Sequence, residues 1–131
     1  MNDANRQCCV LIVEDEMCLA LILEDILEEA GHSVLKAARL PAALAFAESA
    51  QIDAAILDIN LAGTTVFPAA DALRRRGIPF LFTSGYGEKG LPADYENWPM
   101  LQKPYGVERL QRALSNLLGE DAAPVAGPTV R

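Results

Sequence analysis

The sequence is poor in the residues that build zinc and redox centres. Its 131 residues include three cysteines, Cys8, Cys9 and Cys18, and a single histidine, His32. Because the cysteines form no C-x2-C pair, they argue against a zinc site. We interpret them as reduced thiols, with Cys18 as a small apolar helix residue, and a redox role for the adjacent Cys8 and Cys9 is the weaker alternative. His32 follows a glycine and is expected to lie in an exposed turn.

Long apolar runs and an excess of positive charge are also lacking. No apolar run approaches the ~18 residues of a membrane-spanning helix, and residues 1–9 lack the apolar core of a signal peptide. The formal net charge is -7, which argues against sequence-independent binding to nucleic acid. About half of the residues are apolar, so a chain of this length can form one domain with a full core. We therefore expect a cytoplasmic protein that binds neither membranes nor nucleic acid.

Short apolar runs alternate with amphipathic segments along the chain. The runs at 10–13, 54–57 and 78–82 are almost uniformly apolar, which is typical of strands buried on both faces. Further strands are expected at 33–37 and 100–102, and helices at 17–30, 41–50, 68–76 and 107–118. This alternation predicts an α/β fold, in which helices cover both faces of a doubly wound parallel sheet. Glycines and prolines interrupt residues 85–99, so a fourth helix there is expected to be short or irregular.

Ionisable and hydroxyl side chains stand where four of these expected strands end. Glu14 and Asp15 follow the first run, and Asp58 ends the third. Ser84 ends the fourth, and Lys103 follows the fifth. In parallel sheets of this kind the carboxyl ends of the strands form the edge at which ligands bind. These residues are therefore predicted to form one site.

Three carboxylates in one place need compensation. Two unit charges ~4 Å apart repel by ~4 kcal/mol at an effective dielectric of about 20, so ionised Glu14, Asp15 and Asp58 would weaken the fold. Lys103 and a divalent cation would neutralise them, and a small set of oxygen ligands favours Mg2+. Glu16 is expected to face the positive end of the following helix instead.

Asp58 is the candidate nucleophile, because a carboxylate can attack phosphorus and form an acyl phosphate. The metal, Ser84 and Lys103 would bind the oxygens of the transferred phosphoryl group. Thr83 is the fallback for Ser84, since adjacent residues of a strand point to opposite sides. Lys103 precedes Pro104, and a cis peptide bond there would suit such a site. The alternative for Asp58 taken alone is a helix cap or a structural ion pair with Lys103.

Residues 85–90 match the pattern G-x-G-x-x-G. The dinucleotide-binding version of this pattern lies in the first strand-to-helix turn and opens a long helix. Here the pattern follows the fourth apolar run and leads into Leu91 and Pro92. We therefore interpret it as a flexible loop.

These motifs together resemble the receiver domain of two-component response regulators, a CheY-like domain, over residues 8–118. The acidic pair Glu14 and Asp15 and the later Asp58, Ser84 and Lys103 stand in the family's order. The resemblance implies a flavodoxin-like five-stranded sheet in the order 2-1-3-4-5, with Asp58 as the phospho-acceptor. The implied Mg2+ ligands are Glu14, Asp15, Asp58 and the backbone carbonyl of Asn60.

Residues 79–87 resemble more closely the FATGUY subfamily of stand-alone receivers from alphaproteobacteria, with Ser84 where Thr is usual. Members of that subfamily lack the aromatic switch residue of the last strand, and Met100 stands at that position here. The resemblance therefore implies another readout of phosphorylation, such as the ordering of residues 85–99. The chain ends soon after the last helix, so no output domain is expected, and residues 119–131 are expected to form a disordered tail.

These features predict a single-domain response regulator rather than a turnover enzyme. It would accept a phosphoryl group on Asp58 from a sensor histidine kinase or a histidine phosphotransfer protein. It would then signal to an unknown downstream protein by direct contact, or act as a phosphate sink. The enzyme alternative is an aspartyl phosphatase of the haloacid dehalogenase type, but Asn60 stands where those enzymes use a second acid. A third hypothesis is a pseudo-receiver that only binds a partner.

Overall fold

A five-stranded parallel sheet, in the spatial order β2-β1-β3-β6-β7, forms the centre of the molecule. The computed structural model describes residues 7–85 and 91–119. The strands of this sheet are β1 (Cys9–Val13), β2 (Ser33–Ala37), β3 (Ala54–Asp58), β6 (Phe80–Ser84) and β7 (Met100–Gln102). The α-helices are α1 (Met17–Glu29), α2 (Leu40–Ser49), α3 (Phe67–Arg75) and α4 (Val107–Leu118). Because β6 and β7 are the fourth and fifth of these strands along the chain, the predicted α/β fold and the order 2-1-3-4-5 are confirmed.

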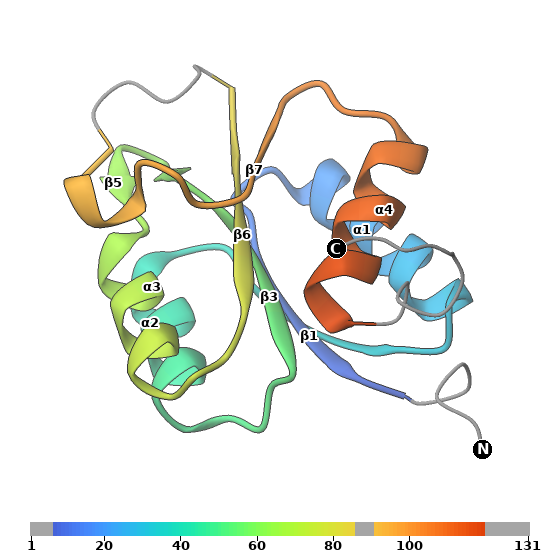
Figure 1. Cartoon of the computed structure of the whole chain (residues 1–131), viewed down its shortest axis with the longest axis horizontal. Helices are drawn as coiled ribbons and strands as arrows, with labels where there is room; N and C mark the ends of the chain where they lie inside the picture. Colours follow the sequence, from blue (N-terminus) through green and yellow to red (C-terminus); the bar gives the residue numbers. More distant parts are fainter. Residues whose placement is uncertain (1–6, 86–90, 120–131) are drawn as a thin grey trace.

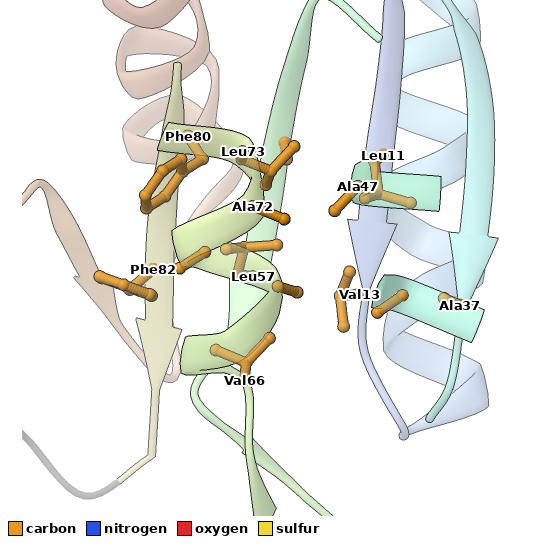
Figure 2. Close-up of a cluster of buried hydrophobic side chains, with 14 of the residues drawn as sticks. Leu11, Val13, Ala37, Ala47, Leu57, Val66, Ala72, Leu73, Phe80 and Phe82 are labelled. Atoms are coloured by element: carbon orange, nitrogen blue, oxygen red, sulfur yellow. The ribbon is translucent and has the colours of Figure 1, made fainter. Parts of the chain in front are cut away.

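Helices cover both faces of the sheet, with α2 and α3 on one face and α1 and α4 on the other (Figure 1). Successive residues of a strand point to opposite faces. In β1, Leu11 and Val13 accordingly pack in the core beneath α2 and α3, which Figure 2 shows in close-up. Val10 and Ile12 pack in a second core with α1 and α4. This burial on both sides explains why the central strands are unbroken apolar runs in the sequence.

The helices begin and end close to the predicted positions. Both α2 and α3 carry a proline in their first turn, where the missing N–H has no intrahelical partner to lose. The last helix, α4, is capped by Gly119 at a φ of 77°, a left-handed conformation that glycine adopts without strain. Within the described residues, no helix is long and apolar enough to cross a membrane. The tail expected at 119–131 lies, apart from Gly119, outside the described residues.

A short antiparallel hairpin follows β3 and was not predicted. It pairs β4 (Asn60–Leu61) with β5 (Thr64–Thr65). The two turn residues, Ala62 and Gly63, both have positive φ, at 53° and 91°. The two residues of such a turn are usually Asn-Gly or Asp-Gly. Because Ala62 takes the first position here, the sequence did not indicate a hairpin. The Asn60 side chain stabilises the turn by accepting the Gly63 N–H at 2.9 Å.

The prediction for His32 is wrong. Its side chain is buried, and Nδ1 accepts the backbone N–H of Cys8 at 3.1 Å. The turn that carries His32 follows α1 and leads directly into β2, so the ring packs back against the start of the sheet. This histidine is therefore part of the folded framework and is not an exposed turn residue.

The irregular fourth helix is confirmed as a single 3-10 turn, η2 (Ala93–Tyr95). Tyr95 is fully buried, and its hydroxyl donates to Oδ1 of Asp71 in α3 at 2.6 Å. Its ring lies edge-on to Phe82 at 5.3 Å between centroids, and Arg74 lies over it. The part of the segment that the structure describes is thus anchored on α3. The flexible loop predicted at 85–90 falls mostly outside the described residues.

Candidate functional site

The ammonium group of Lys103 lies between two buried carboxylates. Its Nζ is 3.1 Å from Oδ2 of Asp58 and 3.1 Å from Oε1 of Glu14. Lys103 follows β7, whereas Asp58 ends β3 and Glu14 follows β1. Because β6 lies between β7 and β3, the long side chain crosses the end of β6 to reach both acids. The carboxyl ends of four strands are thereby joined at one edge of the sheet.

Asp58 is held at the end of β3 with its carboxylate largely out of solvent. Burial raises the pKa of Asp58, and the charge and hydrogen bond of Lys103 oppose that rise without cancelling it. Its Oδ1 accepts the backbone N–H of Asn60 at 3.4 Å. The strand is followed by the hairpin and not by a helix, so the helix-cap alternative is wrong. The ion pair with Lys103 is present, but the raised pKa means that ionised Asp58 remains poorly compensated.

Glu14 is the second acid of the site whose ionised form is disfavoured. Burial raises its pKa to about 7, and the nearby charge of Asp58 adds to the rise. The backbone N–H of Glu16 donates to Oε2 at 3.1 Å and, with Lys103, limits the shift. Burial alone would lower the pKa of Lys103, but its hydrogen bonds and charge interactions with Glu14 and Asp58 outweigh burial and raise it. The lysine is therefore the fixed positive charge of the site at neutral pH.

Three carboxylates are close enough to face a single cation. Ligand oxygens of Glu14, Asp15 and Asp58 lie within 4.8 Å of one another. Asp15 is the most exposed of the three, which leaves the group reachable from solvent. An all-oxygen donor set suits a hard cation such as Mg2+. Its charge would favour the ionised carboxylates, which burial disfavours at both Glu14 and Asp58. The residues present therefore fit the predicted metal.

An open cleft of about 340 Å³ lies over these groups. Asp58, Ser84 and Lys103 are all among the residues that line it. Thr83 and Ser84 are both buried, but Thr83 is not among the lining residues. The backbone carbonyl of Ser84 accepts the Lys103 N–H at 2.8 Å. Of the two adjacent hydroxyls, the one chosen from the sequence is the one that lines the cleft.

Asn60 also lines the cleft, from the hairpin side. The side-chain oxygen of Asn60 accepts the Gly63 N–H. The backbone carbonyl of Asn60 is therefore the group that could bind a cation. The Lys103–Pro104 peptide bond is cis, as the sequence favours.

Two further residues lie near the site: Glu16, which was expected from the sequence to face the positive end of the following helix, and Tyr105, which was not singled out. Glu16 lines the cleft, and its Oε1 lies 3.9 Å from Nζ of Lys103. Tyr105 stands two residues after Lys103, and its hydroxyl is buried. Its position two residues after Lys103 could have indicated Tyr105 from the sequence. An aromatic residue just before a helix is, however, more often a core residue than a site residue.

The sequence of this chain matches a known protein family and proteins that carry the name of regulators. A family model, the response regulator receiver domain, matches residues 10–115. The transcriptional regulatory protein TcrA of Mycobacterium tuberculosis is 32% identical over 116 residues, which cover 81% of this chain and 45% of TcrA. The phyllosphere-induced regulator PhyR of Methylorubrum extorquens is 31% identical over 114 residues, covering 83% of this chain and 43% of PhyR. The chain thus spans less than half the length of these two curated relatives.

Solved structures share the fold. SdrG from Sphingomonas melonis Fr1 is 39% identical with a TM-score of 0.74, covering 86% of this chain and 97% of SdrG. The PhyR receiver domain of Erythrobacter litoralis is 27% identical with a TM-score of 0.77, covering 92% and 97% of the two chains. The receiver domain of the histidine kinase PA1611 from Pseudomonas aeruginosa, which holds a magnesium ion in its active-site cleft, is 26% identical with a TM-score of 0.73, covering 87% and 99%. Since the family model spans most of a chain that has this fold, the chain belongs to the response regulator receiver domain family.

Proposed function

We propose that this receiver domain accepts a phosphoryl group on Asp58 from the phosphohistidine of a sensor histidine kinase or a histidine phosphotransfer protein. The observation that carries the proposal is the position of the Asp58 carboxylate, which lines the open cleft 3.1 Å from the ammonium of Lys103. A carboxylate can attack phosphorus. A fixed cation beside it stabilises the charge of the transferred group.

The transfer exchanges one bond of phosphorus for another. An oxygen of Asp58 forms the new bond, while the bond from phosphorus to the histidine nitrogen breaks and its electron pair returns to the imidazole ring. Lys103 donates to one oxygen of the phosphoryl group, and the hydroxyl of Ser84, on the same cleft wall, donates to another. Positioning and charge stabilisation of this kind account for most catalysis of phosphoryl transfer.

A magnesium ion is the proposed cofactor. Its proposed ligands are Glu14, Asp15, Asp58 and the backbone carbonyl of Asn60. When bound, it would neutralise the negative charge that the phosphoryl group brings to an already acidic cleft. The clustering of the three carboxylates supports this assignment.

The surface of α1 supports docking of a protein donor. This helix begins directly after the acidic residues, and it exposes three large apolar side chains, Met17, Leu21 and Ile22. Val107, at the start of α4, is also exposed. Clustered exposed apolar residues are typical of protein contact surfaces. We propose that the phosphohistidine-bearing protein packs against this end of α1.

The output is proposed to pass through protein contacts, or the domain drains phosphate from a relay. Met100 is half-buried against the core beneath α2 and α3, so a change at Asp58 has no aromatic at this position through which to act. Membership of the FATGUY subfamily stays a prediction. The phosphatase alternative is disfavoured because Asn60, not an acid, follows the nucleophile at the second position. The pseudo-receiver alternative is disfavoured by the full set of acids and lysine.

The test is phosphorylation by acetyl phosphate, followed by intact mass spectrometry. Wild-type protein with Mg2+ should gain one phosphoryl group, and the gain should be lost with a chelator or in Asp58→Ala. Asp53→Asn is the matched control, because Asp53 lies just before the same strand, its carboxylate accepts the Cys9 N–H, and it is not among the residues that line the cleft. An unchanged gain in Asp58→Ala would exclude Asp58 as the acceptor. Steady release of phosphate from an aryl phosphate, lost in Asp58→Ala, would favour the phosphatase alternative.

A further inference from the structure

The hydroxyl of Tyr105 is buried without a hydrogen-bond partner, the one such side-chain atom among the residues that the structure describes. Buried polar groups in proteins are nearly always paired. A hydroxyl left unpaired weakens the fold, and replacing it with an apolar group of the same shape is neutral or stabilising. A phenylalanine would fill this position without that cost, so the hydroxyl calls for a functional explanation.

Tyr105 stands between the site and the core beneath α1 and α4. It lies two residues after Lys103 and two before α4 begins. Its ring packs against the cluster that contains Ile12 and Leu110, which fixes its direction. The hydroxyl is buried, and Tyr105 is not among the residues that line the open cleft.

The charged groups that act on the phenol are those of the site. Burial raises the pKa of Tyr105 to about 12, and Glu14 contributes more to the rise than Asp58 does, while Lys103 opposes it. The hydroxyl therefore keeps its proton at neutral pH. It is a donor, and Glu14 is the acid whose charge acts on it most strongly.

Glu14 already has a donor in the unphosphorylated protein. The ammonium of Lys103 bonds Oε2 of Glu14 at 3.4 Å and Oδ2 of Asp58 at 3.1 Å. A phosphoryl group on Asp58 carries more negative charge than the carboxylate that it replaces, and it would draw the ammonium toward itself. Glu14 would then be a buried carboxylate that has lost one of its donors, while the buried hydroxyl of Tyr105 has no acceptor.

We propose that Tyr105 is a positioning residue whose hydroxyl donates to the Glu14 carboxylate once Lys103 has turned to the phosphoryl group on Asp58. The inference rests on the proposed function. The new hydrogen bond stabilises the phosphorylated state relative to the unmodified one. It also links the site to α4 through the short segment between Lys103 and Val107, on the opposite side of the sheet from Met100.

The test compares Tyr105→Phe with wild type, with Mg2+ present, before and after addition of beryllofluoride as a stable phosphoryl mimic. Thermal unfolding is the first readout. Without the mimic, Tyr105→Phe should be at least as stable as wild type. With the mimic, the melting temperature of wild type should rise by about 3–6 °C more than that of Tyr105→Phe, as expected for one buried hydrogen bond in a domain of this size.

Tyr95→Phe is the matched control. It removes the same atom, but the Tyr95 hydroxyl already donates to Asp71, in the core on the opposite face of the sheet from Tyr105. This variant should lose stability equally with and without beryllofluoride. A second readout is the NMR signal of the Tyr105 hydroxyl proton, which hydrogen bonding should protect from exchange only when beryllofluoride is bound.

The outcomes separate the inference from the function on which it rests. Equal rises in wild type and Tyr105→Phe, or no protected hydroxyl proton, would overturn the role of Tyr105 and leave the proposed function standing. No rise in wild type at all would overturn the proposed function and, with it, this inference.

Discussion

The ammonium of Lys103 lies 3.1 Å from Oδ2 of Asp58, although strand β6 lies between the strands that carry the two residues, β7 and β3. The lysine side chain therefore extends across the end of β6. Neighbouring strands are ~4.8 Å apart, so only a long side chain can span this gap. The same ammonium also contacts Glu14, beyond β1. Lys103 thus contacts acids from two strands, Glu14 and Asp58, and its single positive charge faces two carboxylates. The imbalance leads to the predictions that follow.

Removing the charge of Asp58 should stabilise the protein when no metal is bound. Burial raises the pKa of Asp58, which means that its ionised form is disfavoured in the folded state. In Asp58→Asn, Lys103 still has Glu14 as its partner. We expect the free energy of unfolding, measured by urea denaturation at pH 8 in chelator, to rise above that of wild type. A clear loss of stability would show instead that the Asp58–Lys103 pair is net stabilising.

The stability of the metal-free protein should fall as pH rises through neutrality. The pKa of Glu14 rises from 4.5 to about 7 on folding, mainly because the group is buried. An acid with a raised pKa contributes stability fully below its unfolded value, and this contribution is lost as pH passes through the folded value. Urea denaturation should therefore show a loss on the order of 1–2 kcal/mol between pH 5 and pH 8.

Two variants identify Glu14 as the source of that slope. Glu14→Gln should flatten the profile and be more stable than wild type at pH 8. Glu24→Gln is the control, because Glu24 forms a surface pair with Lys36 at 2.6 Å and should change the slope little. A profile of Glu14→Gln that follows the wild type would assign the slope to other groups.

The contact between α4 and the sheet should carry a large part of the stability. Leu110 is completely buried between this helix and the strands. Leu110→Ala should lower the free energy of unfolding by ~2–5 kcal/mol, through lost burial and the cavity left behind. Val107, in the same helix, is 51% exposed, and Val107→Ala should change stability by less than ~0.5 kcal/mol. Similar losses for both variants would contradict the described packing of α4.

The exposed apolar residues of α1 should matter for transfer from a protein donor but not from a small molecule. Ile22 is 53% exposed, so Ile22→Glu should leave stability and phosphorylation by acetyl phosphate unchanged. It should slow transfer from the cognate phosphohistidine protein about tenfold or more, the size of effect expected at an interface centre. Ala45→Glu, exposed on α2 at the other face of the sheet, is the control. Equal slowing by both variants would move the docking surface away from α1.

The sheet and the site edge could be predicted from the sequence because both follow from simple patterns. Strands buried on both faces are continuous apolar runs, and the residues that end them must meet at one edge. That reasoning predicts that Asp58, Glu14 and Lys103 lie together, as they do in the structure. The resemblance to receiver domains supported Ser84 over Thr83, and Ser84 is the one of the two that lines the cleft.

The remaining features depend on tertiary contacts that no local pattern encodes. The hairpin after β3 turns through Ala62, a residue that seldom adopts positive φ. The burial of His32 depends on the backbone of Cys8, which lies 24 residues earlier. The anchoring of Tyr95 needs Asp71 in another element. The isolation of the Tyr105 hydroxyl is a property of its whole surroundings, so sequence alone could not reveal it.

The central claim, that Asp58 is the phospho-acceptor, is tested most directly by locating the modification. Protein treated with acetyl phosphate and Mg2+ would be reduced with borohydride, which converts an aspartyl phosphate to homoserine, and then digested and sequenced by tandem mass spectrometry. The account predicts that the conversion is found at position 58 and is lost when Mg2+ is chelated. Conversion at another acid, or at none while acetyl phosphate is consumed, would contradict it.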